Sequence, residues 1–145
     1  MNAITVYNDF DPNFSYSKEK IEKIILKVFS ELTYSNIKLS IIFTKREFLS
    51  KMKNEYFNVN QYTDVIAFNF SEDKENFEGE IYISIMDVKE NAELFAQSFE
   101  DEFKRVIIHG ALHLIGYNDI EDKDKLIMQS MENKYLKELN FKIIN

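Results

Sequence analysis

The sequence predicts an α+β fold, in which a mixed sheet of about four strands packs against helices within a single domain covering residues 1–145. Segments rich in β-branched residues lie in the first 86 residues, whereas the remainder has apolar residues at helical spacing. One Pro and three Gly leave no stretch with the composition of a linker. An apolar fraction of 45% in a chain of 145 residues is sufficient for one core.

The N-terminal half alternates between predicted strands and helices. Ser17 is a suitable N-cap for a helix that continues to about Thr33, and Thr44 can cap a shorter helix that reaches about Asn54. The acidic segment Ser71–Gly79 separates the last two strands, which we therefore expect to form a hairpin. The four predicted strands are Ala3–Tyr7, Ile37–Phe43, Val65–Phe70 and Glu80–Met86.

The C-terminal half has a helical pattern from about Asp87 to Ile115, with a break near Gln97. The second part of this pattern, RVIIHGALHLI, is apolar on nearly every side, which predicts a central, buried helix. Gly116 supplies the left-handed conformation that ends it. A last amphipathic helix is expected over Glu121–Leu139, with its inward face formed by Leu126, Ile127, Met131 and Leu136.

Composition excludes several kinds of chemistry. Because cysteine is absent, the chain has no disulfide, no disulfide-linked partner, no thiolate zinc site and no thiol nucleophile. No apolar run approaches the roughly 18 residues of a membrane span, and the N-terminus lacks the pattern of a signal peptide, so we expect a cytoplasmic protein with no membrane partner. A net charge of −7 opposes loose attraction to nucleic acid, and an RNA substrate would need a local basic patch. Candidates for such a patch are Lys45, Arg46, Lys51, Lys53 and Arg105.

The only two histidines, His109 and His113, are four residues apart, which places both imidazoles on one face of a helix. Gly116 and Asp119 follow at intervals of three, giving the pattern HxxxHxxGxxD. A turn at Gly116 can return the Asp119 carboxylate to the imidazoles. This is a usual ligand set for one catalytic zinc ion, and other divalent transition metals also accept it. The pattern predicts a zincin-like site on the central helix, because the Gly and Asp spacing favours a metal over two core histidines.

The residue after the first histidine separates two classes of hydrolase. Zinc peptidases of this type have Glu there as general base, whereas this chain has Gly110. A water activated by the metal is then the obvious nucleophile, which suits cleavage of a phosphodiester. A zinc peptidase and a non-haem iron enzyme, which also binds its metal with two histidines and a carboxylate, stay open as alternatives.

The segment RVIIHGALHLIGY resembles the signature of the YbeY family, HGxLHLxGYxH, in which three histidines bind the metal. Further matches are GEIYISI over Gly79–Ile85, Thr63, Asp64, Val65 and Phe68 in the family's TDVLSF motif, and Met128 and Glu132 downstream. The resemblance implies a cytoplasmic, zinc-dependent endoribonuclease specific for single-stranded RNA. It also implies roles in maturing the 3′ end of 16S ribosomal RNA and in ribosome quality control, with the small ribosomal subunit as a partner.

Two residues depart from the family pattern. Asp119 replaces the third histidine, and Phe57 stands where the family has an Arg expected to hold a phosphate. A ribosome-associated assembly factor with a mainly structural metal is therefore a further alternative. Arg105, one turn before the first histidine, could contact RNA in place of the missing Arg, or could pair with Asp101 on the helix surface. Asp64 could support a ligand histidine through a hydrogen bond, or tie a loop.

Overall fold

The computed structural model describes residues 2–30, 32–57 and 64–145. Within these residues four strands form one sheet in the order β1-β2-β4-β3. Strands β1, β2 and β4 run parallel and β3 is antiparallel to β4, so the predicted mixed sheet and the predicted hairpin are both confirmed. The strands are β1 (Asn2–Asn8), β2 (Asn36–Thr44), β3 (Val65–Asn69) and β4 (Asn76–Ser84).

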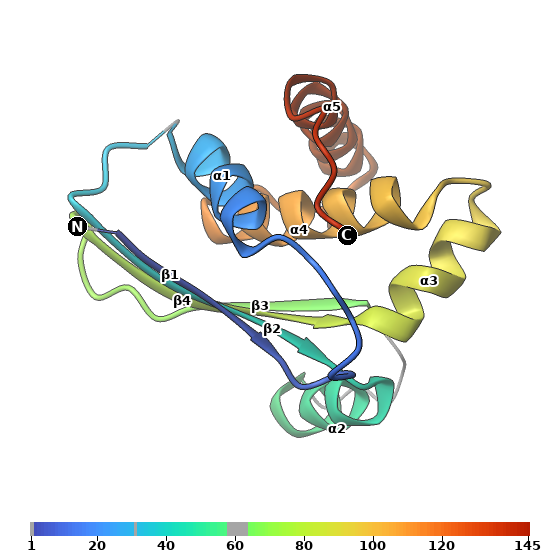
Figure 1. Ribbon diagram of the computed structural model, residues 1–145. Coiled ribbons are helices and arrows are strands. Elements are labelled where there is room, and N and C mark those ends of the chain that lie inside the picture. Colours follow the sequence, from blue (N-terminus) through green and yellow to red (C-terminus); the bar gives the residue numbers. More distant parts are fainter. Residues whose placement is uncertain (1, 31, 58–63) are drawn as a thin grey trace.

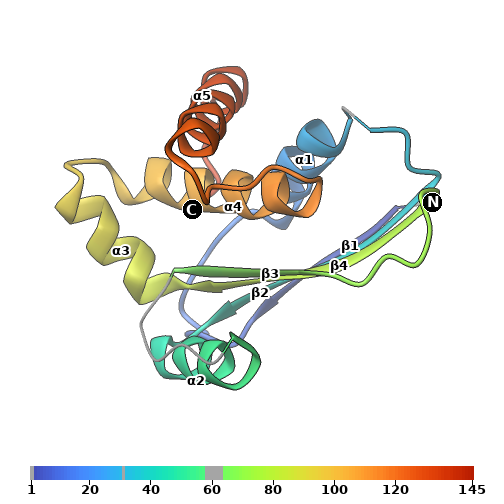
Figure 2. The ribbon, with the colours of Figure 1, turned by 180° about the vertical axis from the view of Figure 1, so that it is seen from behind.

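The helices lie on both faces of the sheet. Figure 1 shows α1 and α4 over one face and α2 under the other, and both views place α5 on the side of α4 away from the sheet (Figure 2). The α+β class is confirmed. The helices are α1 (Lys18–Phe29), α2 (Arg46–Phe57), α3 (Ile85–Leu94), α4 (Phe99–Leu114) and α5 (Asp122–Glu138). Among the described residues, no helix combines the length and apolarity needed to cross a membrane.

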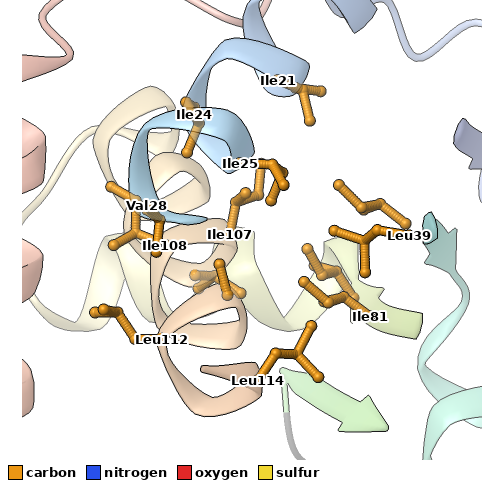
Figure 3. Packing of buried hydrophobic residues seen from close by; sticks show 14 of the residues in the cluster. Ile21, Ile24, Ile25, Val28, Leu39, Ile81, Ile107, Ile108, Leu112 and Leu114 are labelled. Carbon is orange, nitrogen blue, oxygen red and sulfur yellow. The ribbon is translucent and has the colours of Figure 1, made fainter. Parts of the chain in front are cut away.

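Helix α4 is the centre of the core, as its apolar sequence predicts. Ile107 and Ile108 are fully buried, and Figure 3 shows Ile107 beside Ile25 and Ile108 beside Val28 of α1, with Leu39 and Ile81 of the sheet on the other side. Burying each such side chain contributes about 1.5–3 kcal/mol. A helix held from both sides in this way is a rigid support for the residues that it carries.

Local capping sets the ends of α1. The Ser17 Oγ accepts a hydrogen bond from the Lys20 N–H at 3.2 Å, which confirms the predicted N-cap. The helix ends at Phe29, four residues before the predicted end. The hydroxyl of Ser30 donates to the Lys27 carbonyl at 2.6 Å and so satisfies a group of the last turn.

The predicted strand Glu80–Met86 is displaced along the chain. Strand β4 begins earlier, at Asn76, and ends at Ser84, because the Ser84 Oγ accepts a hydrogen bond from the Asp87 N–H and starts α3. Ile85 and Met86 are therefore helical. Their apolar side chains fit either period, so the capping serine decides the boundary.

The predicted break near Gln97 is confirmed. Ala96 ends α3 in the left-handed region with φ of 54°, and the Gln97 N–H donates to the Ala92 carbonyl at 2.8 Å. Helix α4 then begins at Phe99 with Ser98 as its N-cap, because the Ser98 Oγ accepts a hydrogen bond from the Asp101 N–H at 3.0 Å.

The predicted inward face of α5 is partly wrong. Leu126 and Ile127 are 68% and 42% exposed, whereas Met128, Glu132 and Tyr135 are buried. The helix turns Glu132 toward α4, where its carboxylate has partners, and this rotation carries the two apolar residues into solvent.

Candidate metal centre

The C-terminal end of α4 presents both histidines next to a sharp turn. The Gly116 N–H donates to the His113 carbonyl at 3.2 Å, and the Tyr117 N–H donates to the Leu112 carbonyl at 3.0 Å. These two bonds form a Schellman motif, and Gly116 has φ of +113°, which a residue with a side chain rarely adopts. The predicted role of Gly116 is confirmed, and the chain turns back toward the helix immediately after it.

The turn brings Asp119 to the two imidazoles. The Nε2 atoms of His109 and His113 are 3.0 Å apart. The Asp119 carboxylate lies 3.5 Å from His109 Nε2 through Oδ2 and 3.6 Å from His113 Nε2 through Oδ1. One ligand atom from each residue falls within 4.8 Å of the others, and this is the grouping that the sequence predicts.

These distances fit a bound divalent ion. A tetrahedral ion with bonds of about 2.0–2.2 Å separates its ligand atoms by roughly 3.3–3.6 Å. The two distances to Asp119, which involve its two different oxygens, fall in this range, and the 3.0 Å between the imidazole nitrogens is slightly shorter. The donors are two imidazole nitrogens and one carboxylate. The side chains of His109, His113 and Asp119 are 24%, 30% and 42% exposed, so one side of the site is open to a substrate.

Glu132 of α5 supports the first histidine. Its Oε2 lies 2.6 Å from Nδ1 of His109, and its side chain is only 8% exposed. A proton held on Nδ1 by this carboxylate leaves the lone pair on Nε2, the nitrogen that faces His113 and Asp119. Glu132 therefore fixes both the tautomer and the orientation of a ligand ring.

Arg105 completes this support from one turn earlier on α4. Its Nη1 donates to Oε1 of Glu132 at 2.9 Å and its Nη2 donates to Oδ1 of Asn133 at 2.7 Å. The predicted surface pair with Asp101 is wrong, since the guanidinium turns toward α5. A role of Arg105 in RNA contact stays a prediction, and its two bonds favour the positioning of Glu132.

Asp64 lies just before β3 and is close enough to His109 for their charges to interact. Its Oδ2 accepts a hydrogen bond from the Asn91 side chain at 3.1 Å. Burial raises the pKa of Asp64, although the charge of His109 partly opposes this shift. The carboxylate therefore acts on His109 through charge, and the hydrogen bond predicted for Asp64 is made by Glu132 instead.

The two histidines have pKa values shifted in opposite directions. Burial alone would lower the pKa of His109, but the hydrogen bond and charge of Glu132, with the charges of Asp119 and Asp64, raise it. Burial and the charge of His109 lower the pKa of His113. The site therefore attracts one positive charge, which a proton or a metal ion can supply, and keeps the second imidazole neutral for ligation.

Gly110 faces the sheet and not the metal ligands. A Cβ at this position would lie 3.1 Å from the Cγ2 of Ile81 and 3.4 Å from the Cγ2 of Val65. A glutamate there would place its carboxylate against apolar strands. The zinc peptidase alternative therefore lacks both the general base and the space for one.

Arg46, like Arg105, is a candidate for the basic patch whose guanidinium already has acidic partners. Arg46 binds Asp87 at 2.8 Å and Glu90 at 2.5 Å. Thr63 and the side chain of Phe57, where the family has its Arg, lie outside the described residues.

Together, the α+β fold, the helix-borne histidine pair, the carboxylate delivered by the following turn and the open side of the site define a metal-dependent hydrolase. The chain belongs to the YbeY family, because the family model described as Endoribonuclease YbeY matches residues 7–140. This confirms the family recognised from the signature around His109.

Individual relatives agree with this membership. A protein of Karelsulcia muelleri (strain GWSS) named Endoribonuclease YbeY is 45% identical over 121 residues, which cover 83% of this chain and 85% of the relative. A protein of Chlorobium limicola with the same name is 34% identical, over 82% of each chain. The solution structure of TM1509 from Thermotoga maritima has a TM-score of 0.61 and 30% identity, covering 94% of this chain and 88% of that one.

Glu132 is the site residue that sequence reasoning identified only as a family match, without a role. A signal was present in its spacing, since Met128, Glu132 and Tyr135 recur at four and three residues, the period of one helix face. An acid between two large apolar residues on such a face needs a buried partner. Here that partner is His109.

Proposed function

We propose that this chain is an endoribonuclease that cuts single-stranded RNA, with one zinc ion per chain held by His109, His113 and Asp119. The observation that carries the proposal is the convergence of these three ligand atoms in a member of a family whose relatives are named endoribonucleases. An ion bound there supplies Lewis acidity, which makes water a nucleophile near neutral pH and neutralises a phosphoryl oxygen.

The protein's own side chains prepare the site before any substrate arrives. Glu132 holds the proton on Nδ1 of His109 and directs Nε2 toward the site. Asp119 contributes a negative charge that attracts a cation, in place of the neutral third histidine of the family pattern. Arg105 keeps Glu132 in place through its guanidinium.

For the biological setting we propose what the resemblance to the family implies. We propose that the RNA substrate is the precursor at the 3′ end of 16S ribosomal RNA and that the protein takes part in ribosome quality control. The small ribosomal subunit would then be its partner and the cytoplasm its compartment. The absence of cysteine agrees with a reducing compartment.

Metal analysis combined with RNA cleavage tests the proposal. Protein as purified should contain close to one zinc per chain and should cut a single-stranded oligoribonucleotide faster than the same sequence in a duplex. His113→Ala and Asp119→Ala should each lose metal and cleavage together. Asp122→Ala removes an exposed carboxylate at the start of α5 and serves as the matched control, which should keep both. Cleavage that survives complete removal of the metal would refute the proposal.

A second candidate function is favoured by Phe57, which replaces the family's Arg. An assembly factor that lacks this cation would bind small-subunit particles, retain its metal as a structural element and cut no RNA. Restoring the cation by Phe57→Arg discriminates between the two. Under the endoribonuclease proposal the wild-type chain already cuts RNA and the variant is faster, whereas an assembly factor gains cleavage only through the substitution.

A further inference from the structure

The face of the sheet opposite α4 carries a continuous strip of aromatic side chains. Val65 and Ile81 point toward Gly110 of α4, so the alternating residues Phe68 and Tyr82 point to the other face. Their rings lie 6.0 Å apart, centroid to centroid. Phe70 stacks on Phe68 at 5.9 Å with an interplanar angle of 10°.

Helix α2 forms the other wall of this strip. The Phe48 ring lies 6.3 Å from Tyr82, and the Tyr56 ring lies 5.6 Å from Phe68. We call Phe48, Tyr56, Phe68, Phe70 and Tyr82 the aromatic strip. Its outer members are open to solvent: Phe48 is 52%, Tyr56 67% and Phe70 49% exposed. Each ring of the strip contacts at least one other ring of it, so a flat ligand would meet a surface of neighbouring aromatic faces and edges.

The charges beside the strip differ from those of the chain as a whole. The net charge of the chain is −7, yet the segment 45–56, which includes nearly all of α2, has four basic and two acidic side chains. Among its basic residues, Lys45, Lys51 and Lys53 form no ion pair within the part of the chain that the structure describes. Exposed aromatic rings next to lysines are what single-stranded nucleic acid requires, because bases stack on the rings and phosphates approach the cations.

The strip is also connected to the metal centre. Strand β3 is the edge strand of the sheet and starts directly after Asp64, whose charge acts on His109. Phe68 lies four residues after Asp64, about 13 Å away at the usual rise per residue. Figure 2 shows the edge of β3 between α4 above and α2 below. An RNA strand with one phosphate at the metal can therefore cross this edge and reach the strip.

We propose that the aromatic strip binds unpaired bases of single-stranded RNA a few nucleotides away from the cleavage position. The proposal rests on the proposed ribonuclease function and names how the substrate is selected. Base-paired RNA has its bases already stacked on one another, so it cannot use the strip. Selection for single strands would then arise on the outer face of the sheet and not at the metal.

Besides Glu47 and Glu55 in segment 45–56, the sheet itself contributes an acidic group that opposes RNA at the strip. The Glu80 carboxylate accepts a hydrogen bond from the Tyr82 hydroxyl at 3.1 Å and faces the same side of the sheet. The second acid on this face, Glu78, is paired with Lys38 at 3.9 Å. Glu80 therefore provides a test with the opposite sign, because its neutralisation should strengthen binding.

Binding of a fluorescent 12-nucleotide single-stranded RNA to the protein as purified tests the inference, followed by stopped-flow anisotropy so that binding is read before the RNA is cut. Tyr56→Ala and Phe70→Ala should each weaken binding at least about fivefold, as expected for loss of one stacked base. Phe70→Tyr, which keeps a flat ring, should retain the affinity. Glu80→Gln should tighten binding. Phe95→Ala removes an aromatic residue that is 59% exposed after α3 and serves as the control, with no change expected.

The salt dependence separates stacking from general damage. Tyr56→Ala should lower the affinity without changing the slope of log affinity against log salt, whereas Lys51→Ala combined with Lys53→Ala should reduce that slope. Equal RNA affinities for the wild type and the aromatic variants would overturn the inference. It would also be overturned if the wild-type protein were a dimer and the Phe70→Ala variant a monomer, since a second copy of the chain would then cover the strip. Failure of the proposed ribonuclease function can be distinguished from failure of this inference. In the first case the RNA stays intact on a gel, whether or not the strip binds it.

Discussion

Replacement of Glu132 by Gln should weaken metal binding although Glu132 does not touch the metal site directly. The carboxylate accepts two hydrogen bonds, one from Arg105 at 2.9 Å and one from Nδ1 of His109 at 2.6 Å. An amide of the same size has one acceptor and one donor, and both neighbours are donors, so one of these bonds is lost. If the amide N–H₂ faces Nδ1, the proton of His109 moves to Nε2 and blocks the ligand nitrogen.

The size of the effect follows from the geometry. Glu132 is 8% exposed, so water screens its charge little. Loss of a partner behind a metal-bound histidine usually costs 10–100-fold in affinity, which corresponds to about 1.4–2.7 kcal/mol. We expect Glu132→Gln to fall within this range.

Competition with a chromogenic zinc chelator at fixed pH measures this change. Glu138→Gln is the matched control on the same helix, because Glu138 is exposed and pairs only weakly with Lys27 at 3.8 Å. The control should change the affinity less than about twofold. A Glu132→Gln protein with wild-type zinc affinity would show that His109 does not depend on this carboxylate, and the reasoning would be wrong.

Three further predictions concern the support of the site. Gly110→Glu should lower the free energy of unfolding by more than about 2 kcal/mol, because the new carboxylate is forced against apolar strands, and urea unfolding measures this loss. The same variant should show no peptidase activity in a casein assay. A side chain at Gly116 would have free space around it, but Gly116→Ala must adopt φ of +113°, which strains the backbone. We expect a loss of about 1–3 kcal/mol in the free energy of unfolding, measured with urea, and weaker zinc binding, measured by chelator competition. Burial and the charge of Asp64 raise the pKa of Glu102, so the ionised form of Glu102 destabilises the fold. The free energy of unfolding of metal-free protein should therefore fall as pH rises from the pKa of Glu102 in the unfolded chain to its higher pKa in the folded protein. Glu102→Gln should remove that decline, and thermal unfolding of both proteins between acidic and neutral pH would show it; parallel curves would contradict it.

The parts of the fold that depend on local chemistry could be predicted from the sequence. Ser17 caps α1, and Gly116 ends α4, because each signal acts within a few residues of its own position. The convergence of the three predicted metal ligands belongs to the same class, since His109, His113 and Asp119 lie on one helix and the turn after it. Their convergence needs no long-range information.

The parts that depend on packing between distant segments could not be predicted. Leu126 and Ile127 are apolar and predicted to face inward, yet they are exposed because Glu132 decides which side of α5 faces α4. Arg105 also has its partner on another helix, so its spacing to Asp101 was misleading. Hydrophobic periodicity cannot report a buried ionic contact between two helices.

The coordination of the metal in freshly purified protein tests the central claim most directly. X-ray absorption at the zinc edge should show zinc bound by two imidazole nitrogens and a carboxylate oxygen, and metal analysis of His113→Ala should show that the ion is lost. Protein without bound metal, or a metal whose shell contains no imidazole, would contradict the account.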